Sequence, residues 1–417
     1  MEDHRKTVIK VVGLGGGGSN AVNRMIELGI DGIEFIAANT DAQALAQSLA
    51  PVRLQLGPQL TRGLGAGGDP EMGEAAAKES RDEIKEVLNG ADLVFLAAGM
   101  GGGTGTGAIP VAAEVARATG ALTIAIVTTP FLFEGSQRPK NAEAGLARLR
   151  PNVDTLINVP NERLLQLLGK NMKFEFALRV ADEVLRQGVQ GIAELVSKAG
   201  LINVDFAHIR SLMECAGGAM MAIGNGKGDH KAVEAVRQAL RMPLLDIRSI
   251  DAACGVLVHF TGGEDLGLHE ISQAAEEVNR AAPHADVIFG ATLDPMFKGR
   301  AQVILIATGM ASQPLKAMAS AASERLIQRP APAKHSPAPT PPPGSPPGLA
   351  RGRAEGGPEA APVHLADALF NGAAASTGDP LAQPWVVAEA PAAKTHNLDV
   401  PAFLRRRRSL RDFEGRQ

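Results

Sequence analysis

The stretch AGMGGGTGTGAIP, residues 98–110, decides the fold class of this 417-residue chain. Six of the nine residues from Gly99 to Gly107 are glycine, and two of the others are threonine. An apolar, strand-like run comes before them and an apolar, helix-like pattern follows. A turn between a strand and a helix needs only one or two glycines, so six indicate close approach of the backbone to a ligand. Backbone N–H groups at a helix start can surround an anion, with help from the helix dipole.

This stretch is not a Walker A loop, which needs a lysine followed by serine or threonine. No lysine lies between Lys85 and Lys140. The charge of a bound phosphate must therefore be met by backbone dipoles, by a cation or by residues elsewhere, and the hydroxyls of Thr104 and Thr106 would add donors.

A second glycine-rich stretch, VVGLGGGGSN at residues 11–20, also follows an apolar strand. It contains the G-x-G-x-x-G spacing of dinucleotide-binding proteins, and Asp41 follows where such proteins place a ribose-binding acid. Taken alone, the pattern favours an NAD-dependent oxidoreductase, which stays as an alternative. Such enzymes have one fingerprint loop, whereas two loops at the carboxyl ends of two strands can enclose one nucleotide.

Apolar strands alternate with helical patterns around both loops. We expect strands at 7–15, 33–41, 93–101, 121–130 and 153–161, with helices at 20–29 and 108–120. This alternation predicts a parallel sheet covered by helices. The pattern is helical from about residue 170 to 221, and a second α/β region follows. Its helices are expected at 229–240 and 266–282, and its strands at 253–262, 286–294 and 301–309.

The composition argues against some classes of function. The net charge of -3 gives no sign of a nucleic-acid-binding protein. No apolar run reaches the roughly 18 residues that a membrane span needs, and the N-terminus has no signal-peptide core, so we expect a cytoplasmic protein. Cys215 and Cys254 match no metal motif, and we expect two buried free thiols.

The composition changes to Pro, Ala and Gly after residue 312. Such a segment buries too little apolar surface to offset chain entropy, so we expect a disordered linker at 312–396. An apolar cluster before an arginine run, NLDVPAFLRRRR, then indicates a docking peptide at 397–417. Arg405–Arg408 either form a solvated end or attract acidic partners, neighbouring filaments or anionic lipid.

Several blocks in order resemble the FtsZ family, the bacterial tubulin homologues that build the cell-division ring. GGGTGTG is similar to the tubulin-family phosphate signature, and NTDAQAL, LTRGLGAGGDPEMG, PFLFEG, VPNERLL, GLINVDF, GVLVHFTGG and VPAFLRRR match FtsZ segments. The resemblance covers about residues 7–310 and the terminal peptide.

The resemblance implies a tubulin/FtsZ-like α/β fold with a Rossmann-like GTPase domain and a smaller α/β C-terminal domain. The implied parts are the GTPase domain at 7–170, a central helix with the catalytic loop at 171–221, the C-terminal domain at 222–311, the linker and the peptide. It also implies GTP and GDP as ligands, nucleotide-associated Mg²⁺ without a metal site in a single chain, and head-to-tail filaments at mid-cell.

The resemblance assigns nucleotide contacts to the two glycine loops and to a few later side chains. These residues are Gly16, Gly17, Gly18, Ser19, Asn20, Gly103, Thr104, Gly105, Thr106, Glu134, Arg138, Asn161, Leu178 and Asp182. Asp182 would accept two hydrogen bonds from guanine that adenine does not offer, which would select GTP over ATP. FtsZ usually has phenylalanine in place of Leu178, and losing that stacking ring is expected to weaken nucleotide binding.

The implied catalytic loop is GLINVDFAHIR, which one subunit inserts into the nucleotide site of the next. Asn203 and Asp205 match the family, whereas His208 replaces a second acidic residue. A neutral imidazole holds a cation less well, although it can take a proton near neutral pH. We expect a slow GTPase that still polymerises. The alternatives are an active enzyme with His208 as base, and a non-hydrolysing paralogue that co-assembles with a typical FtsZ and regulates it.

The terminal peptide is implied to dock onto membrane tethers and division regulators, so that any membrane contact is indirect. Its docking residues are Leu398, Asp399, Val400, Pro401, Phe403 and Leu404. Other FtsZ copies are further expected partners, and nucleic acid is not.

Overall fold

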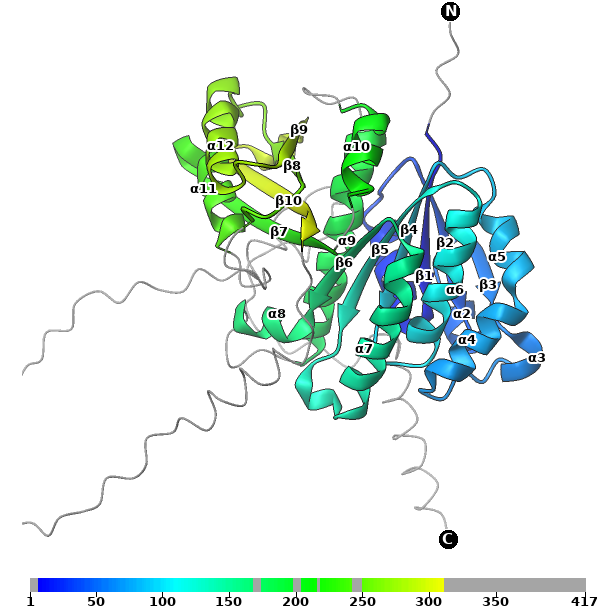
Figure 1. Ribbon diagram of the computed structural model, residues 1–417. Helices are drawn as coiled ribbons and strands as arrows, with labels where there is room; N and C mark the ends of the chain where they lie inside the picture. The colour runs from blue at the N-terminus through cyan, green and yellow to red at the C-terminus, as the bar shows by residue number, and fades with distance from the viewer. Residues whose placement is uncertain (1–6, 168–173, 198–203, 216–217, 242–249, 311–417) are drawn as a thin grey trace, which may run out of the picture. The chain divides into compact units, whose positions relative to one another are not determined.

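A computed structural model describes residues 7–167, 174–197, 204–215, 218–241 and 250–310 (Figure 1). The predicted catalytic residue Asn203, the linker at 312–396 and the docking peptide at 397–417 lie outside these ranges. The predictions for those segments therefore stay predictions.

Within the described ranges, ten strands form one mixed sheet in the order β3-β2-β1-β4-β5-β6-β7-β10-β8-β9. The strands are β1 (Ile9–Leu14), β2 (Ile33–Asn39), β3 (Val52–Gln55), β4 (Leu93–Gly99), β5 (Leu122–Thr129), β6 (Thr155–Pro160), β7 (Gly218–Lys227), β8 (Gly255–Gly262), β9 (Asp286–Leu293) and β10 (Arg300–Met310). Every pair from β3 to β7 is parallel, β10 is antiparallel to β7 and β8, and β9 is parallel to β8. The predicted α/β fold is therefore confirmed.

Helices connect most neighbouring strands. They are α1 (Gly15–Glu27), α2 (Ala42–Ala46), α3 (Pro58–Thr61), α4 (Pro70–Glu79), α5 (Arg81–Leu88), α6 (Thr104–Ala118), α7 (Gln137–Leu149), α8 (Asn161–Leu167), α9 (Phe174–Ser197), α10 (Phe206–Met213), α11 (Lys231–Leu240) and α12 (Leu268–Ala281). None of the helices within the described ranges is long and apolar enough to span a bilayer.

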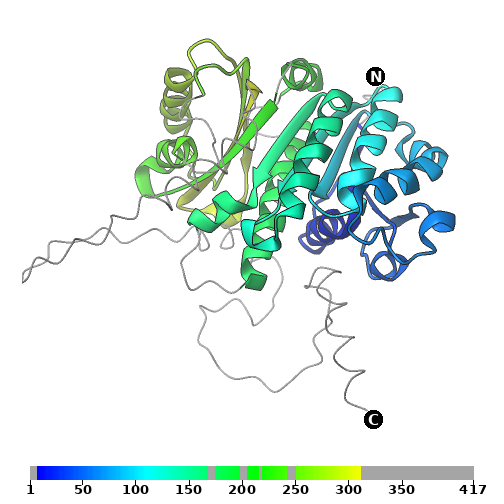
Figure 2. The ribbon, with the colours of Figure 1, turned by 60° about the horizontal axis from the view of Figure 1, so that its bottom comes forward.

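The strand order reverses direction between β1 and β4. The chain leaves β1 through α1 toward β2 on one side, and leaves β4 through α6 toward β5 on the other. Right-handed crossovers place two such helices on opposite faces of the sheet. Helices α4–α7 accordingly cover one face, and α1 contacts α9 on the other (Figures 1 and 2). Open α/β sheets bind ligands at the carboxyl ends of strands where the order reverses in this way.

The central strands are apolar because both faces of the sheet are covered. Every residue of β1 and β5 is buried, as are the first six residues of β4. Such near-continuous apolar runs are typical of parallel strands. The charged exception is Lys10, whose ammonium donates to the carbonyls of Val87 and Asn89 at 3.0 Å each and pairs with Glu34. Burying Lys10 is therefore compensated by three polar partners.

The structure corrects the prediction of helix up to residue 221, because β7 begins at Gly218. This strand lies between β6 and β10, with α11 packed against it. A strand covered on both faces loses the alternation of apolar and polar residues that distinguishes it from a helix. Helices α4 and α5 and the short strand β3 were not predicted.

The two cysteines also differ from the prediction of buried free thiols. Cys215 forms a disulfide with Cys254, with 6.5 Å between their Cα atoms, and Cys254 is exposed. The two residues are 39 positions apart in the chain. Sequence spacing alone could not show that the end of α10 meets the start of β8, because this proximity arises from tertiary packing.

Candidate functional site

The two glycine-rich stretches lie side by side at the carboxyl ends of neighbouring strands. Strands β1 and β4 pair in register, with Gly13 opposite Ala97 and Leu14 opposite Ala98. Helix α1 begins at Gly15 directly after β1, and α6 begins at Thr104 shortly after β4. The prediction that two strand ends bring the two loops together is borne out by this pairing.

Backbone contact between the loops requires glycine at two positions. Gly15 has φ +69°, and a Cβ there would lie 2.8 Å from the amide nitrogen of Gly105. A Cβ on Gly105 would lie 3.2 Å from the carbonyl oxygen of Leu14, at the start of the first loop, and 2.7 Å from that of Gly99 within its own loop. Any other residue would separate the loops, so their sequence is explained by close packing as well as by the space left for a ligand.

The first turns of α1 and α6 present free backbone donors. First-turn N–H groups have no acceptor within their own helix, and no side chain caps either helix. Gly16 and Gly17 are exposed, and a Cβ on Gly16 would meet no atom within 4 Å. Gly18 and Ser19 are buried behind them, and Asn20 is partly exposed. The paired helix starts therefore make a cradle suited to phosphate oxygens.

The two threonines of the second loop have different positions. Thr104 is partly exposed at the start of α6, whereas Thr106 is fully buried. The Thr106 hydroxyl oxygen accepts the N–H of Gly101 at 2.8 Å. Thr106 was expected to face the phosphates, but its side chain supports the glycine turn from inside the protein. A glycine at position 145 of α7 leaves room for the Thr106 methyl group.

A third segment borders the cradle and was not singled out from the sequence. Residues 64–69 lead into α4, and Asp69 caps that helix by accepting the N–H of Glu71 at 2.9 Å. A Cβ on Gly103 would lie 2.9 Å from the Asp69 amide nitrogen, so this segment touches the second glycine loop. The glycine-rich block LTRGLGAGGDPEMG was the available signal, since it follows β3 toward the same edge of the sheet.

Glu134 and Arg138 form an ion pair on the other side of the second loop. The Glu134 carboxylate also accepts the N–H of Phe131 at 2.9 Å. A Cβ on Gly101 would lie 3.2 Å from the Arg138 Cβ, so the arginine adjoins the glycine turn. The ion pair is therefore held next to the cradle, where the guanidinium of Arg138 can face a bound phosphate.

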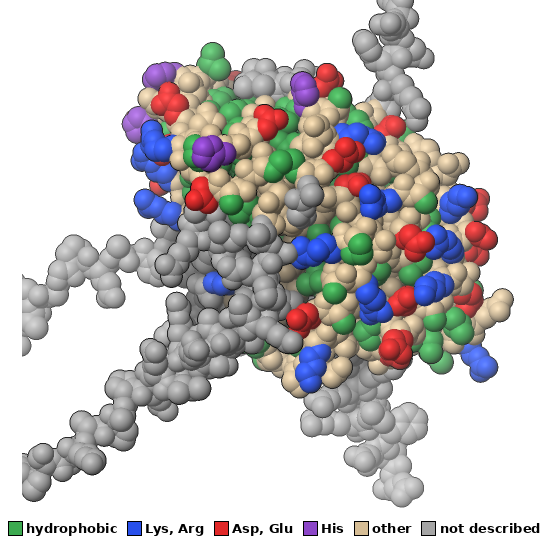
Figure 3. Space-filling view, viewed as in Figure 1, with side chains coloured by type: hydrophobic (Ala, Val, Ile, Leu, Met, Phe, Trp, Pro, Cys, Tyr) green, Lys and Arg blue, Asp and Glu red, His purple; other side chains and the backbone are tan. Residues whose placement is uncertain are grey.

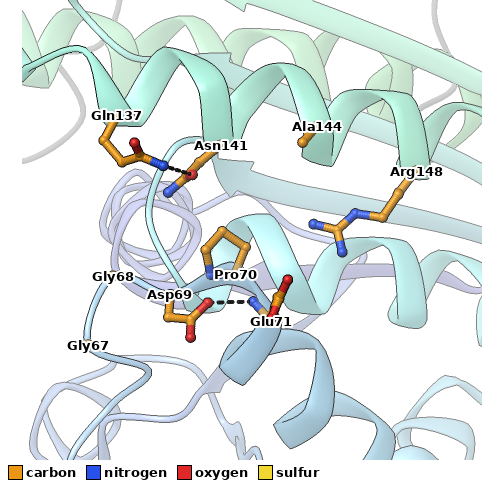
Figure 4. Close-up of a pocket in the computed structure, with 9 residues that line it drawn as sticks. All are labelled: Gly67, Gly68, Asp69, Pro70, Glu71, Gln137, Asn141, Ala144 and Arg148. Carbon is orange, nitrogen blue, oxygen red and sulfur yellow. Dashed lines mark hydrogen bonds between the residues drawn. The ribbon is translucent and has the colours of Figure 1, made fainter.

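A cavity of about 480 Å³ lies beside this region, between residues 67–71 and α7 (Figure 4). Its lining includes Asp69 and Glu71 from one wall and Asn141 and Arg148 from the other. Asn141 donates to the carbonyl of Gly101 at 3.4 Å, which connects this cavity to the glycine turn.

Charged side chains of both signs are interspersed on the face covered by α4–α7 (Figure 3). Glu74 accepts hydrogen bonds from Lys78 and Arg148 on this face. The Lys78 hydrogen bond, with further attraction from Lys78 and Arg148, lowers the pKa of Glu74 although burial opposes the shift.

The remaining predicted nucleotide contacts come from α8 and α9. Asn161 is 6% exposed at the start of α8. Leu178 and Asp182, which are partly exposed, stand four residues apart on α9 and therefore share one face of that helix. Helix α9 contacts both α1 and α8, so these side chains lie on the α1 side of the sheet.

Four buried oxygens on or near these elements have no hydrogen-bond partner among the described residues: Ser19 Oγ, Asn158 Oδ1, Asn161 Oδ1 and, farther along α9, Gln187 Oε1. Leaving such atoms unpaired costs free energy, so they fit a bound molecule that supplies donors. A nucleotide carries donors on its ribose and base. The residues present therefore fit the predicted ligand.

The two predicted catalytic residues in the described ranges, Asp205 and His208, do not lie in the cradle. Both are exposed at the start of α10, and no residue in the described ranges hydrogen-bonds to either side chain. From the same helix, Arg210 donates to the carbonyl of Asp92 at 3.5 Å, immediately before β4 begins. The glycine loop follows the opposite end of β4, about 20 Å away for a strand of this length. The two predicted halves of the site are therefore at opposite edges of the sheet (Figure 1).

Asp41, which an NAD-dependent enzyme would direct at ribose, has another role. Its carboxylate accepts the N–H groups of Gln43 and Ala44 at 3.0 Å each and so caps α2. Across the described part of the chain, no cluster of three or more His, Cys, Asp or Glu side chains is placed to hold a metal ion.

Comparison with known proteins agrees with this geometry. The model of the Tubulin/FtsZ family GTPase domain matches residues 8–169, and that of the FtsZ family C-terminal domain matches residues 217–311. An FtsZ point mutant from M. jannaschii is 47% identical with a TM-score of 0.71, over 73% of this chain and 92% of that one. An empty FtsZ dimer from M. jannaschii is also 47% identical, with a TM-score of 0.71, over 74% and 89%.

A GTPγS-bound protofilament of CetZ2 from Haloferax volcanii is 19% identical with a TM-score of 0.64, over 77% of this chain and 99% of that one, and shows the same fold. Members of the matched family are GTPases that bind GTP and GDP. The matches cover both α/β regions at high identity, so the chain belongs to the Tubulin/FtsZ family and is FtsZ-like.

Proposed function

We propose that this protein binds GTP in the glycine cradle of one subunit and hydrolyses it with α10 of the next subunit in a head-to-tail filament. The observation that carries the proposal is the separation of Asp205 and His208 from the cradle, at opposite edges of one sheet. A single chain cannot bring the two together without unfolding. In a head-to-tail stack, the edge of one copy that carries the start of α10 would lie against the cradle of the next copy.

The binding half uses backbone groups for phosphate and side chains for the rest of the nucleotide. First-turn N–H groups of α1 and α6 hold the phosphates, and Thr104 adds a hydroxyl donor. Arg138 contributes a positive charge from beside the glycine turn. Asn161 and Asp182 recognise ribose and guanine, while Leu178 provides an apolar wall without the π-face of the usual phenylalanine.

The catalytic half supplies a carboxylate. Asp205, exposed at the first turn of α10, accepts a hydrogen bond from water and orients it toward the terminal phosphate. Asn203 is assigned beside it by the family pattern. Mg²⁺ bound with the nucleotide would supply positive charge that offsets the phosphate charge during phosphoryl transfer.

His208 favours slow hydrolysis. Its imidazole stands exposed near Asp205 with no partner among the described residues, where the family pattern has an acid. Replacing a negative charge with a neutral ring weakens cation binding at the junction. His208→Asp is therefore expected to raise phosphate release per polymerised subunit severalfold, and an unchanged rate at equal polymer mass would contradict the assignment.

The presence of His208 in place of an acidic residue also supports a second candidate function. In this alternative, the protein is a paralogue that does not hydrolyse GTP but co-assembles with a typical FtsZ and regulates it. Sedimentation separates the two candidates. A GTPase that forms filaments pellets alone with GTP and Mg²⁺ and releases phosphate, whereas a regulator pellets only when a typical FtsZ is added.

Exposed apolar side chains support self-association. Leu132 and Phe133 are 54% and 58% exposed in the turn that ends at Glu134, next to the nucleotide cradle. Large apolar residues exposed together commonly mark a protein interface. We propose that the filaments act in the division ring at mid-cell in the cytoplasm, and that the docking peptide at 397–417 binds membrane tethers and regulators.

The proposal is tested by measuring phosphate release and pelleting of the purified chain with GTP and Mg²⁺. Asp205→Ala should still bind GTP and pellet, yet release little phosphate. If wild-type protein neither binds GTP nor pellets, the proposed function is wrong. If Asp205→Ala releases phosphate at the wild-type rate, the proposal of GTP binding in the cradle stands, but the catalytic role of Asp205 is wrong.

A further inference from the structure

Thr40 connects three segments that border the cradle. It follows β2, the neighbour of β1, and its side chain is fully buried. Its hydroxyl oxygen lies 2.6 Å from the hydroxyl oxygen of Thr104. Its carbonyl accepts the N–H of Gly65 at 3.2 Å. The sequence alone predicts no role for Thr40.

The direction of the bond between the two hydroxyls decides what Thr104 can do. Each threonine has one hydroxyl proton. If Thr104 donates to Thr40, its only proton is used and it cannot donate to a phosphate. If Thr40 donates to Thr104, the proton of Thr104 is free to point into the cradle. No other side chain within the described residues hydrogen-bonds to the Thr40 hydroxyl, so Thr104 is its natural acceptor.

We propose that Thr40 is a positioning residue that donates its hydroxyl proton to Thr104 and so directs the Thr104 hydroxyl at a bound phosphate. The inference rests on the proposed function, because it requires a phosphate at the start of α6. Thr40 is itself too buried to touch the ligand and acts only through Thr104. Donation along a chain of hydroxyls also polarises the second bond, which strengthens it toward an anion.

This role predicts an effect that depends on the phosphates of the ligand. Removing the Thr40 hydroxyl should weaken binding of GTP and GDP by about 2- to 12-fold, the range for one hydrogen bond. Guanosine has no phosphate and should bind equally well before and after the change. A general loss of packing would weaken all three ligands alike.

The test uses the full-length chain at concentrations below polymerisation, with equilibrium binding of GTP, GDP and guanosine. Thr40→Val keeps the shape and removes the hydroxyl, whereas Thr40→Ser keeps the hydroxyl and should bind GTP almost as wild type does. Thr123→Val is the matched control. Thr123 is also fully buried, but its hydroxyl donates to the carbonyl of Ala121 at the other end of the sheet.

A double-mutant cycle makes the result specific to the pair. When Thr104→Val is already present, adding Thr40→Val should cause no further loss of GTP affinity. Equal GTP affinity in wild type and Thr40→Val, an equal loss for guanosine, or additive losses in the cycle would each overturn the inference. Failure of the wild-type chain to bind GTP would instead overturn the proposed function.

Discussion

The nucleotide cradle and the start of α10 are built in contrasting ways. The cradle is made of backbone, with glycines packed so closely that a Cβ at Gly105 would lie 2.7 Å from another main-chain atom. The start of α10 presents Asp205 and His208 as exposed side chains without partners among the described residues. The cradle is preorganised within the chain, whereas the side chains at the start of α10 are open to a second molecule. The difference supports the proposal that one subunit binds the nucleotide and that a pair of subunits hydrolyses it.

The largest expected effect concerns Asp205. Asp205→Asn keeps the size of the side chain but removes the charge that orients water, so GTP turnover in polymer should fall by about 100-fold or more. GTP affinity should not change, because Asp205 lies at the opposite edge of the sheet from the cradle. Phosphate release and equilibrium binding measure the two effects. A parallel loss of affinity would show that the two halves are not separate.

An intermediate effect is expected within the second glycine loop. Gly105→Ala places a methyl group against the carbonyl oxygens of Gly99 and of Leu14 in the first loop, and overpacking of this kind typically costs about 1–3 kcal/mol. We expect GTP affinity to fall by about tenfold or more as the loops separate. Gly267→Ala is the control, because a Cβ there would meet no protein atom within 4 Å and the residue precedes α12, outside the cradle. Thermal unfolding and GTP binding of both variants make the comparison, and similar losses in the two would contradict the role of close packing.

The smallest expected effect is on stability at acid pH. Hydrogen bonding to Lys78 and Arg148 lowers the pKa of Glu74 below its ordinary value of 4.5. A group whose pKa is lower in the folded state stabilises the fold above its unfolded pKa and loses that contribution as pH falls through the folded pKa. Both ion pairs of Glu74 are partly exposed, so we expect them to contribute less than about 1 kcal/mol to the free energy of unfolding.

Urea unfolding from neutral to acid pH tests this expectation. The difference in unfolding free energy between wild type and Glu74→Gln should be largest at neutral pH and shrink below pH 4.5. Glu276→Gln, which removes an exposed carboxylate of α12, is the control and should give a smaller difference. A difference for Glu74→Gln that does not change with pH would argue against the ion pairs.

The sequence predicted the parts of the fold that depend on local pattern. The apolar runs at 7–15 and 93–101 contain β1 and β4, because buried parallel strands have few polar residues. It also predicted that two glycine loops would share one edge of a sheet. It did not reveal β7, whose burial on both faces removes the alternation that marks a strand.

Site residues were harder to distinguish by sequence. Thr104 and Thr106 have the same side chain and stand two positions apart, yet Thr106 is buried against the glycine turn whereas Thr104 is partly exposed and contacts Thr40. Thr40 gave no signal because its importance comes from a contact with a residue 64 positions away. The disulfide between Cys215 and Cys254 was missed for the same reason.

The most direct test of the shared site is GTP turnover per subunit, measured from concentrations at which the chain sediments as a monomer up to concentrations at which it pellets. If cradle and α10 act only across a junction, turnover per subunit stays near zero in the monomer range and rises steeply once copies stack. Turnover per subunit that is the same in isolated monomers and in filaments would contradict the central claim.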